Sequence, residues 1–86
     1  MNEALLQKIH SASHLIVPMA EQGWPPAQTI LRQLGWCRML LMGLPVEPRP
    51  GPFSMGLIAT REFDMYGDQP DLARQINEIQ KAMDSL

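Results

Sequence analysis

The chain has 86 residues and a mass of 9.7 kDa, so we expect a single domain over residues 1–86. Its composition, 45% hydrophobic and 19% charged, is typical of a folded globular chain and excludes a disordered one. The formal net charge of −2, without a cluster of Lys or Arg, disfavours nucleic-acid binding, and the single cysteine, Cys37, excludes an internal disulfide.

The sequence pattern favours a soluble cytoplasmic protein. The start, Met1-Asn2-Glu3, is acidic and polar, whereas a secretory signal begins with basic residues. The longest apolar stretch, residues 39–46, contains Gly43 and Pro45 and is far shorter than the ~20 residues that a membrane helix needs. A single cysteine suits a reducing compartment. We therefore expect no membrane partner.

The first predicted helix covers residues 2–22. Asn2 can cap it, because its side-chain oxygen can accept a free backbone N–H of the first turn. Apolar residues recur at alternating spacings of four and three and so predict one buried stripe: Leu5, Ile9, Ala12, Ile16 and Met19. Pro18 predicts a kink, and Gly23 predicts the left-handed residue at which the helix stops.

A second helix is predicted over residues 26–43, because Pro25-Pro26 fit a first turn and Gly43 marks an end. Its apolar stripe is Ile30, Leu34, Cys37, Leu41 and Leu44. Gly35 could let another backbone approach closely. Further apolar residues lie off the stripe, so this helix is central to the fold or carries a partner-facing patch: Trp36, Met39, Leu40 and Met42.

The middle of the chain is a proline-rich connector followed by an ambiguous apolar run. Residues 44–52 read LPVEPRPGP, which predicts a stiff, extended segment. Residues 54–64 fit either a short buried strand or a short helix. A helix is favoured, with Ser54 as its cap, because a lone strand has nothing to pair with in a helical chain.

The last predicted helix covers residues 69–85. Tyr66-Gly67 predict the turn before it, Asp68 can cap it, and Pro70 fits its first turn. Its apolar stripe is Leu72, Ile76, Ile79 and Met83. The sequence therefore predicts an all-α bundle of about four helices.

The residues that could carry chemistry do not form catalytic patterns. His10 and His14 lie four apart, which can put two imidazoles on one metal, but no HExxH motif or cysteine pair supplies further ligands. Cys37 lies on an apolar stripe, where a buried small hydrophobe is expected. Glu62 and Asp64, two apart on a helix, do not face each other. We expect no enzyme activity, no metal and no cofactor.

An acidic segment runs from Arg61 to Asp71 and has a net charge of −3. It fits two interpretations: helix caps in a solvated turn, or an acidic face aimed at a basic pocket of another protein. Tyrosine is among the residue types that anchor interfaces, and Tyr66 lies within this segment. The candidate partner-binding residues are Glu62, Asp64, Tyr66 and Asp68.

Three segments, in order, carry a resemblance to a known family. Gln33-Leu34 and Arg38-Met39-Leu40-Leu41 match a long helix of that family. Residues 55–64, MGLIATREFD, match its pattern aliphatic-Gly-x-Ile-Ala-x-basic-Glu-Phe-Asp. Pro70-Asp71-Leu72-Ala73-Arg74 match the opening of its next helix. The chain thus resembles, over residues 30–76, the small immunity proteins paired with a type VI secretion NAD(P)⁺-glycohydrolase toxin.

The resemblance implies an all-helical, non-catalytic protein that binds a cognate secreted toxin domain and covers its NAD-binding cleft. Such a protein protects the producing cell from losing its dinucleotide pool. The alternative is a small regulatory or adaptor antitoxin that acts by protein–protein or DNA binding; the net charge argues against the DNA-binding form. Trp24 and Trp36 fit either the core or an interface.

Overall fold

The computed structural model describes residues 3–48, 51–65, 67 and 69–85, and within them it is all-helical, with no strand. The elements are α1 (Glu3–Glu21), α2 (Pro25–Leu41), α3 (Met55–Ala59), a π-helical segment η1 (Thr60–Met65) and α4 (Pro70–Asp84). The predicted all-α bundle is confirmed, and so is the choice of helix over strand after Ser54. Asn2 and Asp68, two of the predicted caps, lie outside the described residues.

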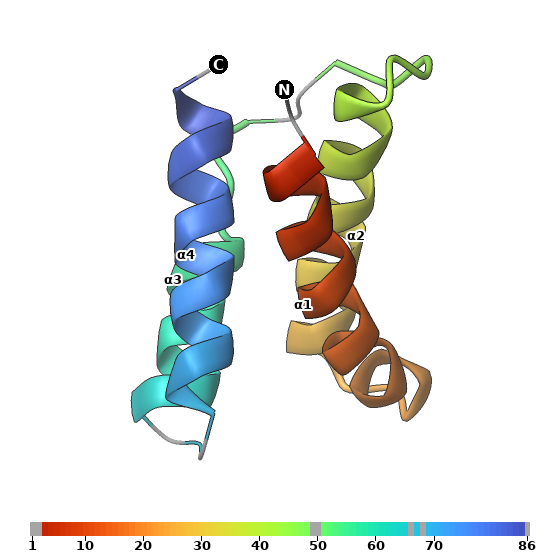
Figure 1. Ribbon diagram of the computed structural model, residues 1–86. Helices are drawn as coiled ribbons and strands as arrows, with labels where there is room; N and C mark the ends of the chain where they lie inside the picture. The colour runs from red at the N-terminus through yellow and green to blue at the C-terminus, as the bar shows by residue number, and fades with distance from the viewer. Residues whose placement is uncertain (1–2, 49–50, 66, 68, 86) are drawn as a thin grey trace.

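The helices form two facing pairs (Figure 1). α1 packs against α2 in one pair, α3 and η1 pack against α4 in the other, and α1 also contacts α4 across the middle. The radius of gyration is 12.1 Å, close to the ~12 Å expected of a folded chain of this length. No helix in the described ranges has both the length and the apolar character needed to cross a membrane.

Glycines end the two long helices of the first pair by the same local motif. Gly23 and Gly43 have positive φ angles of 86° and 74°. After α1, the Gly23 N–H donates to the Ala20 carbonyl (3.0 Å) and the Trp24 N–H to the Met19 carbonyl (3.4 Å), the pattern of a Schellman motif. Both predicted stops are confirmed, although α2 ends at Leu41 rather than at 43. Pro18 lies inside α1, which continues to Glu21.

The core lies between the two pairs and uses most of the predicted stripes. The fully or almost fully buried apolar residues are Ile9, Ala12, Ile16, Ala27, Ile30, Leu34, Cys37, Met55, Ala59, Phe63, Leu72, Ala73, Ile76, Ile79 and Met83. Leu5, Met19 and Leu41 pack at its border. This burial is the main source of stability, at ~25 cal/mol per Å² of apolar surface removed from water.

Two expectations about α2 were wrong. Leu44 was assigned to its buried stripe, but the helix ends before it and the left-handed turn at Gly43 leaves Leu44 44% exposed. Gly35 was expected to let another backbone approach closely, yet no atom beyond its chain neighbours and its own helix backbone lies within 4 Å of the place where its Cβ would be. It faces solvent, so no packing requires a glycine there.

α3 is anchored by side-chain amides from both of its neighbours. The side chain of Gln33 in α2 binds Ser54 and Met55 at the start of α3. In α4, the Gln80 Oε1 accepts the Gly56 N–H (2.8 Å), and the Asn77 Nδ2 donates to the Thr60 Oγ1 (2.9 Å). Ser54 stands at the N-cap position, but its hydroxyl caps no backbone N–H of α3, so the predicted cap was wrong.

The backbone widens into η1 directly after this anchored turn. The Thr60 hydroxyl donates to the Gly56 carbonyl four residues earlier (2.9 Å), and Asn77 donates to the same carbonyl (3.3 Å). Side-chain bonds to the i−4 carbonyl compete with the backbone ladder and bend helices. The π-helix thus begins at Thr60, where Asn77 of α4 bonds the chain. Such elements are rare and frequently occur at functional sites.

Candidate functional site: a cleft beside the π-helix

The predicted partner-binding residues fall on and after η1. Glu62 and Asp64 both belong to this element. The side chain of Glu62 is 23% exposed, whereas Asp64 is exposed. Tyr66 and Asp68 lie outside the described residues. The structure therefore gives one of the four predicted residues, Glu62, a half-buried environment.

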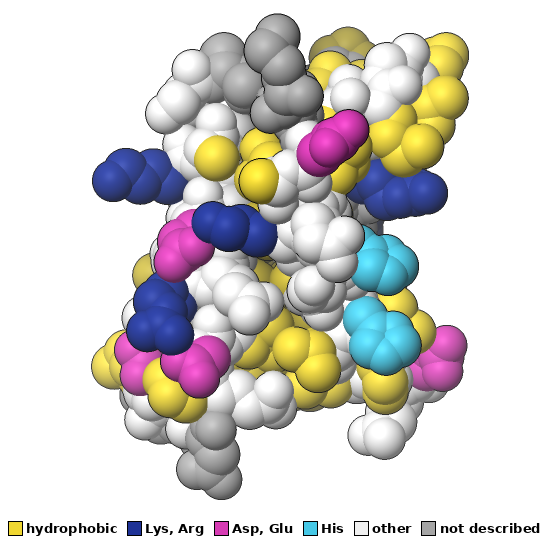
Figure 2. Space-filling view, viewed as in Figure 1, with side chains coloured by type: hydrophobic (Ala, Val, Ile, Leu, Met, Phe, Trp, Pro, Cys, Tyr) yellow, Lys and Arg dark blue, Asp and Glu magenta, His cyan; other side chains and the backbone are white. Residues whose placement is uncertain are grey.

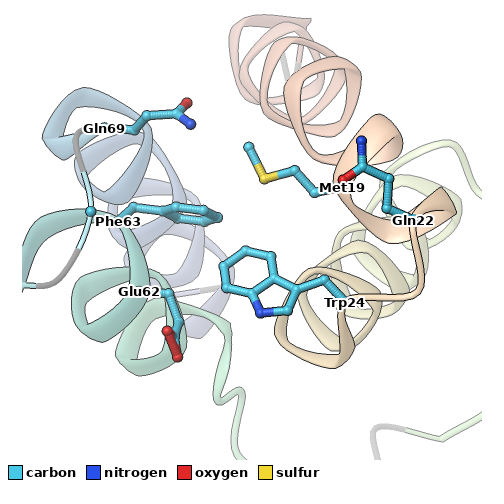
Figure 3. Close-up of a pocket in the computed structure, with 7 residues that line it drawn as sticks. Met19, Gln22, Trp24, Glu62, Phe63 and Gln69 are labelled. Carbon is cyan, nitrogen blue, oxygen red and sulfur yellow. The ribbon is translucent and has the colours of Figure 1, made fainter.

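Glu62 borders an open cleft of about 260 Å³ between the two helix pairs (Figure 3). In the close-up, Phe63 and Glu62 come from η1 on one side, and Met19 and Trp24 from the end of α1 and the start of α2 on the other. The lining residues are Met19, Gln22, Trp24, Glu62, Phe63, Gly67 and Gln69. The cleft thus joins segments about 40 positions apart in the chain.

Two aromatic rings form the floor of the cleft. The ring centroids of Trp24 and Phe63 are 5.8 Å apart, and the ring planes meet at 69°, an edge-to-face contact. Phe63 is only 3% exposed, as expected for a core residue, while Trp24 is half-buried. Such pairs contribute ~0.5–1.5 kcal/mol beyond their burial. The contact fixes η1 against the corner between α1 and α2.

Gly67 and Gln69 close the end of η1. The Gln69 N–H donates to the Phe63 carbonyl (2.9 Å). A Cβ on Gly67 would lie 2.3 Å from the Glu62 carbonyl oxygen, so only glycine fits this approach without a shift of the backbone. The backbone on either side of Glu62 is therefore held in place.

Glu62 gives the cleft a negative, hydrogen-bond-accepting edge. In the described part of the chain, it is the one charged residue among those that line the cleft. Its neighbour Arg61 lies outside the lining, with the Arg61 Nε 3.5 Å from the Glu62 Oε1. The side-chain amides of Gln22 and Gln69 supply further donors and acceptors. A carboxylate on the same cleft as a half-buried tryptophan can receive a cationic group.

The histidines and the cysteine do not gather into a second site. Both histidines are exposed and lie beside each other on the face shown in Figure 2. Cys37 is fully buried in the core, as predicted. Within the described ranges, no group of three or more His, Cys, Asp or Glu side chains is placed to hold a metal ion.

Two apolar surfaces also remain uncovered. Met39, Leu40, Met42 and Leu44 are exposed around the end of α2. Leu57 and Met65, on α3 and η1, are 71% and 67% exposed. Trp36 is not part of these surfaces: it is half-buried, packs edge-to-face on Phe53, and donates its indole N–H to the Glu47 carbonyl (2.8 Å).

On the α1 side of the cleft, the sequence left Trp24 open between the core and an interface, and it did not place Met19 or Gln22 at a site. One local signal for two of them was available. In a Schellman motif the residue after the left-handed glycine often contacts the residue that opens the last turn. Here those residues are Trp24 and Met19, on either side of Gly23. No local pattern could have paired them with Phe63.

Comparison with known proteins adds no relative: no protein-family model, no curated protein and no solved structure matches this chain.

Proposed function

We propose that this protein is an immunity protein, which binds a cognate secreted toxin domain and occludes the active-site cleft with which that toxin degrades NAD(P)⁺. It acts in the cytoplasm of the producing cell, has no catalytic role of its own, and binds through the acidic segment that contains Glu62 and Asp64. The observation that carries the proposal is the placement of Glu62 at the edge of an aromatic cleft, on a π-helix held from both sides.

Rigid presentation of η1 supports this function. The amides of Gln33 and Gln80 hold α3 from opposite neighbours, and the ring contact with Trp24 holds Phe63. A surface that is already ordered loses little conformational freedom on binding, and this raises affinity without further contacts. An inhibitor of a toxin that turns over many times needs such affinity: a nanomolar complex corresponds to ~12 kcal/mol.

The charge of the segment supports it as well. A cleft that binds a dinucleotide offers backbone donors and basic groups to the pyrophosphate. Glu62 and Asp64 are carboxylates that could compete for those groups, and opposite charges speed the encounter of two proteins. Among the described residues, Glu62 forms an ion pair only with its exposed neighbour Arg61, so the fold there does not depend on a buried salt bridge.

The segments that carry the family resemblance lie together in space. Gln33 from the first segment binds Ser54 and Met55 at the start of the second. The Gly56 carbonyl and the Thr60 hydroxyl of the second accept hydrogen bonds from the side-chain amide of Asn77, one turn beyond the end of the third. The elements that carry the resemblance, α2, α3 with η1, and α4, therefore contact one another, and the acidic residues Glu62 and Asp64 lie on η1 within this group.

The test takes the proteins encoded beside this protein's gene, purified and assayed for NAD⁺ hydrolysis. We expect this protein to inhibit hydrolysis stoichiometrically, at one copy per toxin, and to rescue cells that express the toxin. Asp64→Lys with Glu62→Lys should weaken inhibition. Glu3→Lys with Glu47→Lys makes the same charge change at two exposed positions that do not line the cleft, and is the matched control. Failure to bind the neighbouring toxin, or to rescue cells, would contradict the proposal.

A further inference from the structure

We infer that the cleft beside Trp24 and Glu62 is the receptor for one arginine side chain of the partner, whose guanidinium lies against the half-buried Trp24 ring and pairs with Glu62. This inference rests on the proposed function and specifies the chemistry of the partner at the same site. It follows from the size of the cleft, its apolar floor and its charge.

The size of the cleft selects a side chain. At about 260 Å³ and open on one side, it lies below the ~300–1,000 Å³ of pockets that enclose drug-sized ligands. A dinucleotide or an extended peptide does not fit into it. One long side chain from a partner surface does, and the open mouth admits that surface.

The floor of the cleft selects a side chain with a flat or methylene-rich body. The Trp24 ring, the Phe63 ring and the Met19 thioether all reach toward the gap between the helix pairs (Figure 3). Arginine stacks on aromatic faces and is less strongly hydrated than lysine, so it loses less on leaving water. Tryptophan is the best aromatic partner for a cation, within ~6 Å of the ring centroid.

The carboxylate of Glu62 at the rim of the cleft favours a positively charged side chain. The side chain of Glu62 is 23% exposed, and an apolar partner would remove water from its carboxylate without replacing the hydrogen bonds. An acidic partner would be repelled. A guanidinium offers five N–H donors in one plane, and two of them can pair with the carboxylate of Glu62.

Arg61 already pairs with Glu62, so it competes with the partner's arginine for the same carboxylate. Its Nε lies 3.5 Å from the Glu62 Oε1, a long and half-exposed ion pair, which is the weak kind. A carboxylate has acceptor sites for more than one donor, so an incoming guanidinium can share Glu62 or displace Arg61. Removal of the Arg61 charge should therefore strengthen binding, a result that a merely structural role of Glu62 does not produce.

The test is an NMR titration of the full chain with Nα-acetyl-arginine methylamide, followed at the indole N–H of Trp24. We expect a saturable shift that Glu62→Gln weakens about tenfold and that Arg61→Gln strengthens by a few-fold. The uncharged Nα-acetyl-norleucine methylamide should give no saturable shift. Thermal unfolding of each variant checks that the fold is intact.

The inference is overturned if the arginine probe does not saturate, if Glu62→Gln binds it as the parent does, or if norleucine binds equally well. Because this titration needs no toxin, it is independent of the inhibition assay. If the chain binds the arginine probe but not the toxin, the proposed function is wrong. If it binds the toxin but not the arginine probe, only this inference is wrong. In a complex with the toxin, Arg61→Gln should likewise slow dissociation and Glu62→Gln should speed it.

Discussion

Gln33 and Ser54, 21 positions apart, are joined by two hydrogen bonds of opposite direction. The Gln33 Nε2 donates to the Ser54 Oγ (2.8 Å), and the Ser54 N–H donates to the Gln33 Oε1 (3.0 Å). The same Oε1 accepts the Met55 N–H (2.9 Å). A side chain of α2 therefore does for α3 what a local cap does for most helices: it satisfies backbone donors that have no partner within the helix.

Gln33→Leu should destabilise the fold by ~1–3 kcal/mol, because it keeps the bulk of the side chain but leaves two part-buried N–H groups without an acceptor. Urea unfolding followed by circular dichroism measures the loss. The matched control is Gln7→Leu on α1, at an exposed position, where we expect a change within ~0.5 kcal/mol. Equal effects of the two substitutions would mean that Gln33 does not hold α3.

Alanine at Gly56 and at Gly35 should have opposite effects. A Cβ on Gly56 would lie 2.6 Å from the Asn77 Oδ1 and 2.9 Å from the Gln80 Oε1, so both amides must leave their hydrogen bonds. Gly56→Ala should destabilise by ~1–3 kcal/mol. Gly35 is helical with open space around it, so Gly35→Ala should stabilise by ~0.5–1 kcal/mol. The midpoints of thermal unfolding should move in opposite directions; two upward shifts would contradict the packing at Gly56.

Phe63→Ala should cost ~3–5 kcal/mol, a large part of the ~5–15 kcal/mol that stabilises a small domain. The milder pair Phe63→Leu and Trp24→Leu, measured singly and together, should give a coupling energy of ~0.5–1.5 kcal/mol from the edge-to-face contact. Denaturant unfolding of the four proteins supplies the cycle. A coupling near zero would mean that the rings do not join the two helix pairs.

The ion pair between Lys8 and Glu78 predicts how one contribution to the free energy of unfolding changes with pH. The hydrogen bond from Lys8 Nζ (2.9 Å), followed by its charge, holds the pKa of Glu78 below its ordinary 4.5. A lowered pKa means that the stabilisation is fully present above pH 4.5 and is lost as the pH falls through the value in the folded protein.

Lys8→Met should therefore be less stable than the parent at neutral pH, and the difference should shrink as the pH falls below 4.5. Unfolding in urea at a series of pH values measures it. Lys81→Met, at another exposed lysine, should show no such convergence. A difference that is constant with pH would show that the pair does not link α1 to α4.

Charge reversal at Asp64 should slow association with the toxin more than it lowers folding stability, because Asp64 is exposed on η1. Asp64→Lys, alone or with Asp68→Lys, is compared with Glu47→Lys by stopped-flow or surface plasmon resonance at two salt concentrations. The slowing should be larger at low salt. Unchanged association with a collapse of thermal stability would assign Asp64 a role in the fold instead.

Patterns within a few residues were enough to predict most of the helices. The four-three spacing from Ile9 to Ile16 and from Leu72 to Met83 marked the buried stripes, and Gly23 and Gly43 marked the stops. These predictions succeeded because helix periodicity and capping act between positions three to six apart, all of which are visible in the sequence. They placed Glu62 and Asp64 on one element but said nothing of its surroundings.

What the sequence alone determined is thus the number, type and approximate extent of the helices, together with the acidic character of residues 61–71. Only the tertiary structure decided that α3 is capped by Gln33, that the chain widens into a π-helix after Ala59, and that Trp24 meets Phe63 beside Glu62. The physical reason is that these contacts join residues some 20 to 40 positions apart, and their geometry exists only after the helix pairs have packed on a common core.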